Sequence, residues 1–153
     1  MGTRSIIAVM HGDVAKAVYC HWDGYLSYVG KILQEHYADS GKVNHLISLG
    51  DISSLGPEIG TKHPFDNIDA KVTYQEFKQQ YGHMTTFYGR DHGETNVGFQ
   101  VLPTWAELLE YADSCSAEFV YVQNQGVWYV FSPYNNVLEL LTEALDSHTD
   151  LDD

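Results

Sequence analysis

The sequence predicts an α+β domain in which an antiparallel sheet, built from hairpins, is covered mainly on one face by four or five helices. The sheet is predicted because a pair of β-rich runs around a short turn occurs near each end of the chain. The helices are predicted because several other segments repeat apolar residues at helical spacing. The 153 residues, 44% of them hydrophobic, can bury one core. We therefore expect a single acidic domain over residues 1–153, with a frayed end at 147–153.

Strands are expected in two clear hairpins and in one less regular pair of runs. The hairpins are residues 5–10 and 14–21 around His11-Gly12-Asp13, and residues 119–123 and 127–132 around Asn124-Gln125-Gly126. In the second turn, Gly126 suits a backbone with positive φ. Residues 84–88 and 97–102 are also expected to be strands, joined by the polar turn 89–94.

Helices are expected where capping residues precede a helical repeat of apolar residues. Asp23 can cap the first of them, which runs through Tyr37. The others are expected at residues 41–49, ending at Gly50, at 73–81, from Thr104 through Ala112, and at 134–147. Residues 51–70 have no clear period and contain several Gly and Pro, which predicts a long loop.

The formal net charge of −13 is unevenly distributed along the chain. Residues 1–90 hold all eight Lys and Arg and nine of the 21 Asp and Glu, whereas residues 91–153 hold twelve Asp and Glu and no Lys or Arg. A field of this sign repels nucleic acid and anionic membranes, and attracts basic protein surfaces or cations. We therefore expect a protein partner with a basic surface, and no direct binding of nucleic acid.

The remaining composition indicates a protein of a reducing compartment. No apolar run reaches 18 residues and no charged-then-apolar leader is present, so we expect neither a membrane span nor secretion. Cys20 and Cys115 are too few and too far apart for a disulfide framework. No glycine-rich phosphate loop occurs, and we expect no cofactor. Exposed aromatic residues on the sheet could support a homodimer.

Several motifs in the first 95 residues resemble those of one protein family. They are TRSIIA at residues 3–8, YCHWDGY at 19–25 with Val29-Gly30, Leu33 and His36-Tyr37 following, LGDISSLG at 49–56 and YGRDHGE at 88–94. The family is one of small, mostly uncharacterised phage-encoded proteins with a TRS-hydrophobic-IA start and a YCHWDGY…VG..L..HY motif. The resemblance implies a phage origin and a location in the cytoplasm of the infected bacterial host. Such small phage proteins often interfere with host enzymes or defence systems.

The acidic residues of the second half are the first candidate site. Within the helix expected at 134–147, Glu139, Glu143 and Asp146 are spaced i, i+4 and i+7 and would share one face, while Glu107 and Glu110 form a similar i, i+3 pair. This spacing is close to that of DNA phosphates, about 3.4 Å per strand. We therefore expect an inhibitor that binds a nucleic-acid-binding host defence enzyme, with carboxylates in place of phosphates (anti-CRISPR or anti-restriction type). The alternative is a solvated acidic face that only confers solubility.

A second candidate site would bind a nucleotide and sequester a host immune signal. It combines guanidinium groups, which bind phosphate, with aromatic rings, which stack on a base. Its candidate residues are Arg4, Tyr19, Trp22, Tyr25, Tyr88 and Arg90. The alternative is that these aromatic residues pack in the core and the arginines pair with acidic neighbours.

A third candidate is a metal-dependent hydrolase. His21 and Asp23 lie in one turn and His92 and Glu94 in another, and imidazole and carboxylate bind several metals. The alternative is that Asp23 caps a helix and the other three make local contacts. A Cys20–His21 dyad is excluded on a regular strand because neighbouring side chains point to opposite faces. The sequence therefore favours a protein that is not an enzyme.

Overall fold

The computed structural model describes residues 3–62, 79, 82–133 and 135–148, and the account below concerns these residues. The helix expected at 73–81 and the second part of the loop expected at 51–70 fall on residues outside this description. No described helix is long and apolar enough to cross a membrane.

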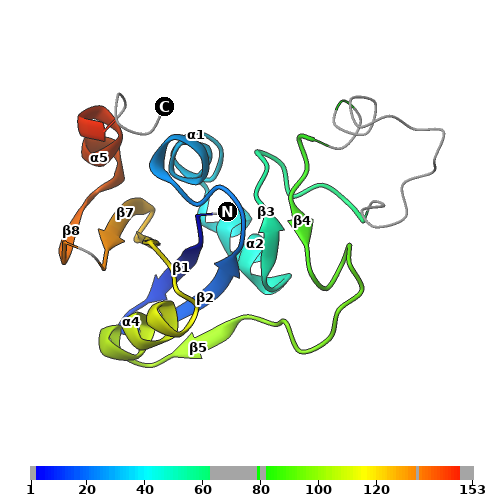
Figure 1. Cartoon of the computed structure of the whole chain (residues 1–153), viewed down its shortest axis with the longest axis horizontal. Coiled ribbons are helices and arrows are strands. Elements are labelled where there is room, and N and C mark those ends of the chain that lie inside the picture. The colour runs from blue at the N-terminus through cyan, green and yellow to red at the C-terminus, as the bar shows by residue number, and fades with distance from the viewer. Residues whose placement is uncertain (1–2, 63–78, 80–81, 134, 149–153) are drawn as a thin grey trace.

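One mixed sheet of eight strands forms the centre of the described structure. The strands are β1 (Ser5–His11), β2 (Val14–Cys20), β3 (Ile52–Ser54), β4 (Thr86–Phe87), β5 (Gln100–Leu102), β6 (Phe119–Asn124), β7 (Val127–Ser132) and β8 (Val137–Leu140). Their order is β4-β3-β2-β1-β6-β7-β8, with β5 paired to β2. In Figure 1, β8 lies at one end of the sheet, on the left, and β3 and β4 lie toward the other.

Both expected hairpins are confirmed, but the prediction of an antiparallel sheet is wrong. Strands β1 and β2 pair antiparallel, as do β6 and β7. Their first strands, β1 and β6, lie side by side in parallel, and β2 also pairs in parallel with β3. The strands expected at 84–88 and 97–102 are shorter, and they pair with β3 and β2 rather than with each other. Turn sequences specify each hairpin, whereas packing decides which strands of different hairpins become neighbours.

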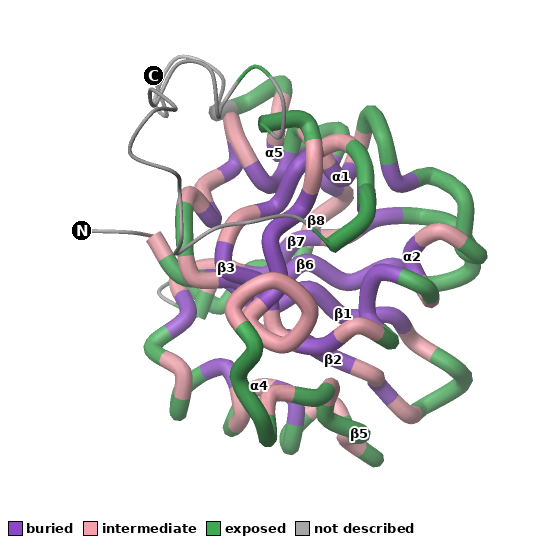
Figure 2. The backbone as a smooth tube through the Cα atoms, turned by 90° about the vertical axis from the view of Figure 1, so that its right-hand side faces the viewer, coloured by how far each residue is buried: buried purple, intermediate pink, exposed green. Residues whose placement is uncertain are grey.

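Helices lie on both faces of the sheet. They are η1 (Leu26–Gly30, a π-helix), α1 (Lys31–His36), α2 (Ser40–Ser48), α4 (Trp105–Ser114) and α5 (Leu141–His148). Alternate residues of β1 enter two separate cores: Ile7 and Val9 pack with residues of η1, α1, α2 and α5, while Ile6 and Ala8 pack with residues of α4. Figure 2 shows α1 and α5 above the strands and α4 below them.

The first expected helix differs from the prediction at its start. Asp23 does not cap it, because Asp23 has a left-handed backbone (φ 57°) and Tyr25 precedes η1 without a side-chain cap. The bend is fixed by Gly24, whose N–H donates to the Thr3 carbonyl at 2.7 Å. A Cβ atom at Gly24 would lie 2.7 Å from the Ser5 Cβ, so this packing accepts only glycine. Close approach of Gly24 to Ser5 therefore overrides the capping signal.

Two other helices begin and end close to the expected residues. The Thr104 side chain accepts a hydrogen bond from the Glu107 N–H at 3.1 Å, which confirms the expected cap of α4. Helix α2 starts one residue earlier than expected because Asp39 caps it by accepting from the Lys42 N–H. Gly50, with φ 90°, follows its end as expected.

The helix expected at 134–147 is the largest error. Residues 137–140 form strand β8 instead, which pairs with β7 so that Val137 lies opposite Ser132 and Leu140 opposite Tyr129. Only Leu141–His148 is helical. Apolar spacing in this segment fits either structure, and the open edge of β7 stabilises the strand. Helix α5 continues through His148, and residues 149–153 of the end expected to be frayed lie outside the described residues.

Candidate functional site

The structure separates the carboxylates of the first candidate site. Glu139 lies on β8, and only Glu143 and Asp146 lie on α5, so the prediction of one helical face carrying all three is wrong. Glu107 and Glu110 lie on α4, which packs on the opposite face of the sheet from α5. The acidic residues therefore form two surfaces, the α5 surface (Glu139, Glu143, Asp146) and the α4 surface (Glu107, Glu110).

Four of these five acidic residues lie at the surface of the folded protein. The side chains of Glu107, Glu110, Glu143 and Asp146 are exposed. Within the described part of the chain, no Lys or Arg lies within ion-pair distance of these four carboxylates. The described Lys and Arg residues of the first half therefore do not pair with these four carboxylates.

Strand β8 joins the α5 surface to an apolar edge of the sheet. It is the last strand in the order, and among the described strands it pairs only with β7. Val137 and Leu138 are 48% and 52% exposed, which is unusual for large apolar residues in a sheet. Sheet edges of this kind can pair with a strand of another chain.

Each face of the sheet is hollowed beside β8. On the α4 side, a largely apolar hollow of about 180 Å³ is lined by Met10, Trp105, Val122, Asn124, Tyr129 and Leu138. On the α5 side, a hollow of about 210 Å³ is lined by Leu26, Phe119, Val130, Ser132, Asn135, Val137 and Glu139. Both hollows lie over β8 and the strands on its inner side, and residues of β8 line each of them.

A second group of residues surrounds Tyr19 at the end of β2, and we call Arg4, Tyr19, His21, Asp51 and Tyr88 the Tyr19 cluster. The Tyr19 hydroxyl and the His21 Nδ1 are 2.6 Å apart, and the Tyr19 N–H donates to the Asp51 carboxylate at 3.0 Å. Burial raises the pKa of Tyr19, and the nearby Arg4 charge opposes this shift. Tyr88 lies close enough for its charge to contribute as well. The structure thus brings together part of the expected nucleotide site.

The electrostatics of His21 favour its neutral form. Burial lowers the pKa of His21, and the positive charge of Arg4 lowers it further. The exposed Trp22 ring packs edge-on against the His21 ring, with 4.6 Å between the centroids. Neutral His21, Arg4 and the flat ring of Trp22 offer hydrogen-bond donors beside an aromatic face, which suits a small anionic aromatic ligand.

Three residues of this region were missed by the sequence reasoning. Burial raises the pKa of Asp51, and Tyr111 and Cys115 of the α4 end share electrostatic interactions with it. Asp51 belongs to the LGDISSLG motif and could have been selected from it. Tyr111 and Cys115 have no local signal, because only the packing of α4 on β2 brings them to Tyr19.

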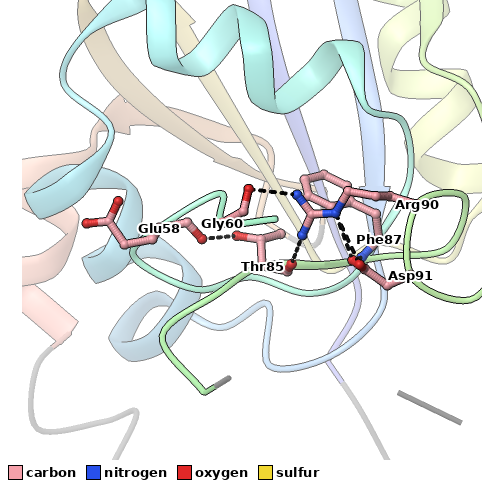
Figure 3. Close-up of polar contacts among 6 residues, drawn as sticks. All are labelled: Glu58, Gly60, Thr85, Phe87, Arg90 and Asp91. Carbon is pink, nitrogen blue, oxygen red and sulfur yellow. Dashed lines mark hydrogen bonds and ion pairs between the residues drawn. The ribbon is translucent and has the colours of Figure 1, made fainter. Parts of the chain in front are cut away.

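Arg90 and Tyr25, which were expected in the nucleotide site, have other contacts. Arg90 donates to the carbonyls of Gly60 (3.1 Å) and Thr85 (2.8 Å) and pairs with Asp91 at 3.1 Å (Figure 3). Its guanidinium also lies over the Phe87 ring, 4.7 Å from the centroid. Through these contacts, Arg90 connects the loop at Gly60 to the chain at β4 and stabilises this arrangement.

Tyr25 lies at the start of η1, where its ring contacts Tyr28 at 6.3 Å between centroids. This places Tyr25 among residues that pack the first helix. We therefore exclude Tyr25 and Arg90 from the candidate ligand contacts and keep Arg4, Tyr19, Trp22 and Tyr88.

The four metal candidates do not converge. Among the described residues, no group of three or more His, Cys, Asp and Glu is arranged to hold a metal ion. Asp23 lies in the bend before η1, and His92 stacks on Tyr88 at 5.2 Å between centroids. Within the described residues, His21, Asp23, His92 and Glu94 therefore do not form the candidate metal site. Cys20 is buried, and burial raises the pKa of its thiol to about 12, so it is a poor nucleophile.

No protein-family model, curated protein or solved structure matches this chain. The functional argument therefore depends on the geometry and charge of the chain itself.

Proposed function

We propose that this protein is an acidic, phage-encoded interaction protein that binds a host protein with a basic surface in the cytoplasm of the infected cell. The observation that carries the proposal is the β8 edge, where the exposed apolar residues Val137 and Leu138 adjoin α5 with its exposed Glu143 and Asp146. The target class that we favour is a nucleic-acid-binding defence enzyme, because such enzymes present the basic clefts that a negative surface complements.

The β8 edge supports docking of an extended segment of the partner. Backbone groups on the outer side of β8 can pair with an added strand. The exposed Val137 and Leu138 favour apolar side chains in that segment. Basic residues flanking it would complement Glu143 and Asp146.

Charge determines which partners the edge accepts. The second half of the chain contains no Lys or Arg, so an acidic segment would be repelled and a basic one attracted. A second copy of this protein would bring the same acidic edge against itself, which disfavours a homodimer through β8. We propose phosphate mimicry for two carboxylates only. Glu143 and Asp146, one turn apart on α5, would occupy positions that phosphates take in the natural ligand of the partner.

The test compares charge reversal on the two acidic surfaces. Affinity capture from host lysate supplies a candidate partner, and calorimetry then measures its affinity for purified variants. Glu143→Lys/Asp146→Lys should weaken binding by about tenfold or more, because it replaces attraction with repulsion at the contact. Glu107→Lys/Glu110→Lys is the matched control, since it changes the net charge equally on the opposite face. Leu138→Lys should also weaken binding.

Equal affinities for the two double variants would contradict the proposed surface. An affinity unchanged by Leu138→Lys would contradict docking on β8. Raised salt should weaken the wild-type complex, because the screening length falls from about 30 Å at 0.01 M to about 3 Å at 1 M.

Binding of a nucleotide immune signal is a second candidate function, favoured by the 2.6 Å contact between Tyr19 and neutral His21 beside Arg4. Arg4 would bind a phosphate, and Trp22 or Tyr88 would stack on the base. Thermal-shift measurements against cyclic and ADP-ribose-type nucleotides test it. A stabilising shift in the wild type that Arg4→Ala removes would support this function, and no shift with any nucleotide would contradict it.

A further inference from the structure

The largest of the described hollows lies between the two hairpin turns, away from the Tyr19 cluster. Its volume is about 560 Å³, and its walls include the turn at His11-Gly12-Asp13, the turn at Asn124-Gln125-Gly126, and Ser40 and Asn44 of α2. Met10 and Asn124 also line the apolar hollow beside β8. We call this space the turn hollow.

Sheet topology explains why a hollow forms here. Strands β1 and β6 are parallel neighbours, so their carboxyl ends meet at the same end of the sheet. After β1 the chain turns to β2 on one side, and after β6 it turns to β7 on the other. The two turns diverge and leave a crevice at the carboxyl ends of parallel strands, the position at which open sheets commonly bind ligands.

Gln123 places an unused acceptor in the wall of the turn hollow. Its side chain is 1% exposed, and its amide nitrogen donates to the carbonyls of Tyr37 and Ala38, both at 3.2 Å. These two bonds fix the orientation of the amide. Its Oε1 has no hydrogen-bond partner among the described residues. A buried carbonyl oxygen without a hydrogen-bond donor is uncommon in proteins. A ligand that carries a donor group could therefore supply the hydrogen bond that this oxygen lacks.

The other lining groups restrict the chemistry of the ligand. The hollow contains the Asp13 carboxylate and no Lys or Arg. Both polar atoms of the Asn44 side chain already have hydrogen-bond partners. Its Oδ1 contacts the His11 Nε2 at 3.2 Å, and its Nδ2 donates to the Ser40 carbonyl at 2.9 Å. Ser40, Asn124 and Gln125 can each donate or accept hydrogen bonds and do not select the charge of a ligand. The selective features are the Gln123 acceptor and the negative charge of Asp13, in a protein with a net charge of −13. An anion would be repelled, and a cation that donates hydrogen bonds would be attracted.

We propose that the turn hollow binds a small organic cation of the polyamine class, with one ammonium group donating to Gln123 Oε1 and another pairing with Asp13. This site is independent of the proposed docking at β8. Because Gln123 Oε1 is buried, an ammonium group reaches it only when side chains at the wall of the hollow move.

Calorimetric titration with spermidine tests this proposal. Asp13→Asn, on an exposed turn, should weaken spermidine binding about tenfold, because a charge-assisted hydrogen bond is lost. Asp113→Asn on α4 is the matched control: it removes the same charge from an exposed position outside the hollow and should leave the affinity within about twofold. The β8 variant Leu138→Lys should also leave it unchanged, which separates this site from the docking surface.

Nuclear magnetic resonance gives a second and independent readout. In the wild type, spermidine should shift the side-chain amide signals of the Asn and Gln residues that line the hollow, Gln123 among them, more than those of Asn and Gln residues outside it. Gln123→Met should abolish the tight binding, with circular dichroism confirming that the variant folds. Equal weakening by Asp13→Asn and Asp113→Asn, or shifts spread evenly over the acidic surface, would overturn the proposal in favour of non-specific attraction.

Discussion

Replacement of Arg90 by alanine should destabilise the fold strongly, and this outcome decides between a structural and a ligand-binding role for Arg90. The Arg90 side chain is 15% exposed and that of its partner Asp91 is fully buried. Asp91 also accepts a hydrogen bond from the Phe87 N–H at 2.8 Å, so its carboxylate is held in place when the arginine is removed. The substitution therefore leaves a buried charge without its cation.

Loss of one partner from a buried ion pair costs about 3–5 kcal/mol. The variant also loses the hydrogen bonds from Arg90 to the carbonyls of Gly60 and Thr85, which tie a distant loop to β4 (Figure 3). Because domains are stable by about 5–15 kcal/mol, the loss is a large fraction of the total. For a domain of this size each kcal/mol lowers Tm by about 2–4 °C, so we expect a decrease on the order of 10 °C.

Urea denaturation followed by tryptophan fluorescence measures this change. Arg4→Ala, which truncates an exposed arginine, is the control and should change the free energy of unfolding by less than about 0.5 kcal/mol. Arg90→Ala/Asp91→Asn should be less destabilised than the two single losses together, because the unpaired charge is gone. A free energy of unfolding within about 1 kcal/mol of the wild type for Arg90→Ala would refute the structural role.

Two further predictions test the local structure. Thr104→Ala should lower the free energy of unfolding by about 1 kcal/mol, because the Glu107 N–H loses its acceptor. In the same urea assay, Thr104→Ser should keep most of the wild-type stability. An alanine variant as stable as the wild type would contradict the cap. Because the pKa of His21 is lowered in the folded protein, the unfolded chain binds a proton at this residue more readily than the folded chain does. The contribution of His21 to stability is therefore present above pH 6.5 and is lost as the pH falls below that value. The difference in unfolding free energy between the wild type and His21→Gln should therefore shift against the wild type between pH 7 and 5, and a pH-independent difference would show that the His21 pKa is not lowered.

Local signals in the sequence predicted the elements that depend on a few neighbouring residues. The hairpin turn at Gln125-Gly126 adopts positive φ at both residues, 52° and 81°, as a short turn between twisted strands requires. The cap at Thr104 and the positive φ of Gly50 are local in the same sense. In the candidate sites, the sequence identified Arg4, Tyr19, Trp22 and Tyr88, because their chemistry is evident from residue type.

Contacts between distant segments decided the rest. Asp23 failed as a cap because Gly24 packs against Ser5, and Val137–Leu140 became a strand because β7 offers an open edge. Both outcomes depend on the neighbour that the folded chain supplies, which no short window of sequence contains.

The amino-acid order alone specified the chemical character of this protein: an acidic second half without basic residues, and hairpins near both ends. Only the tertiary structure decided that β1 and β6 are parallel, that α4 and α5 lie on opposite faces, and that Arg90 fastens a loop. The physical reason is that charge and turn preference are properties of residues and their nearest neighbours. Strand order and the burial of a charge are instead set by packing energies between segments far apart in the chain.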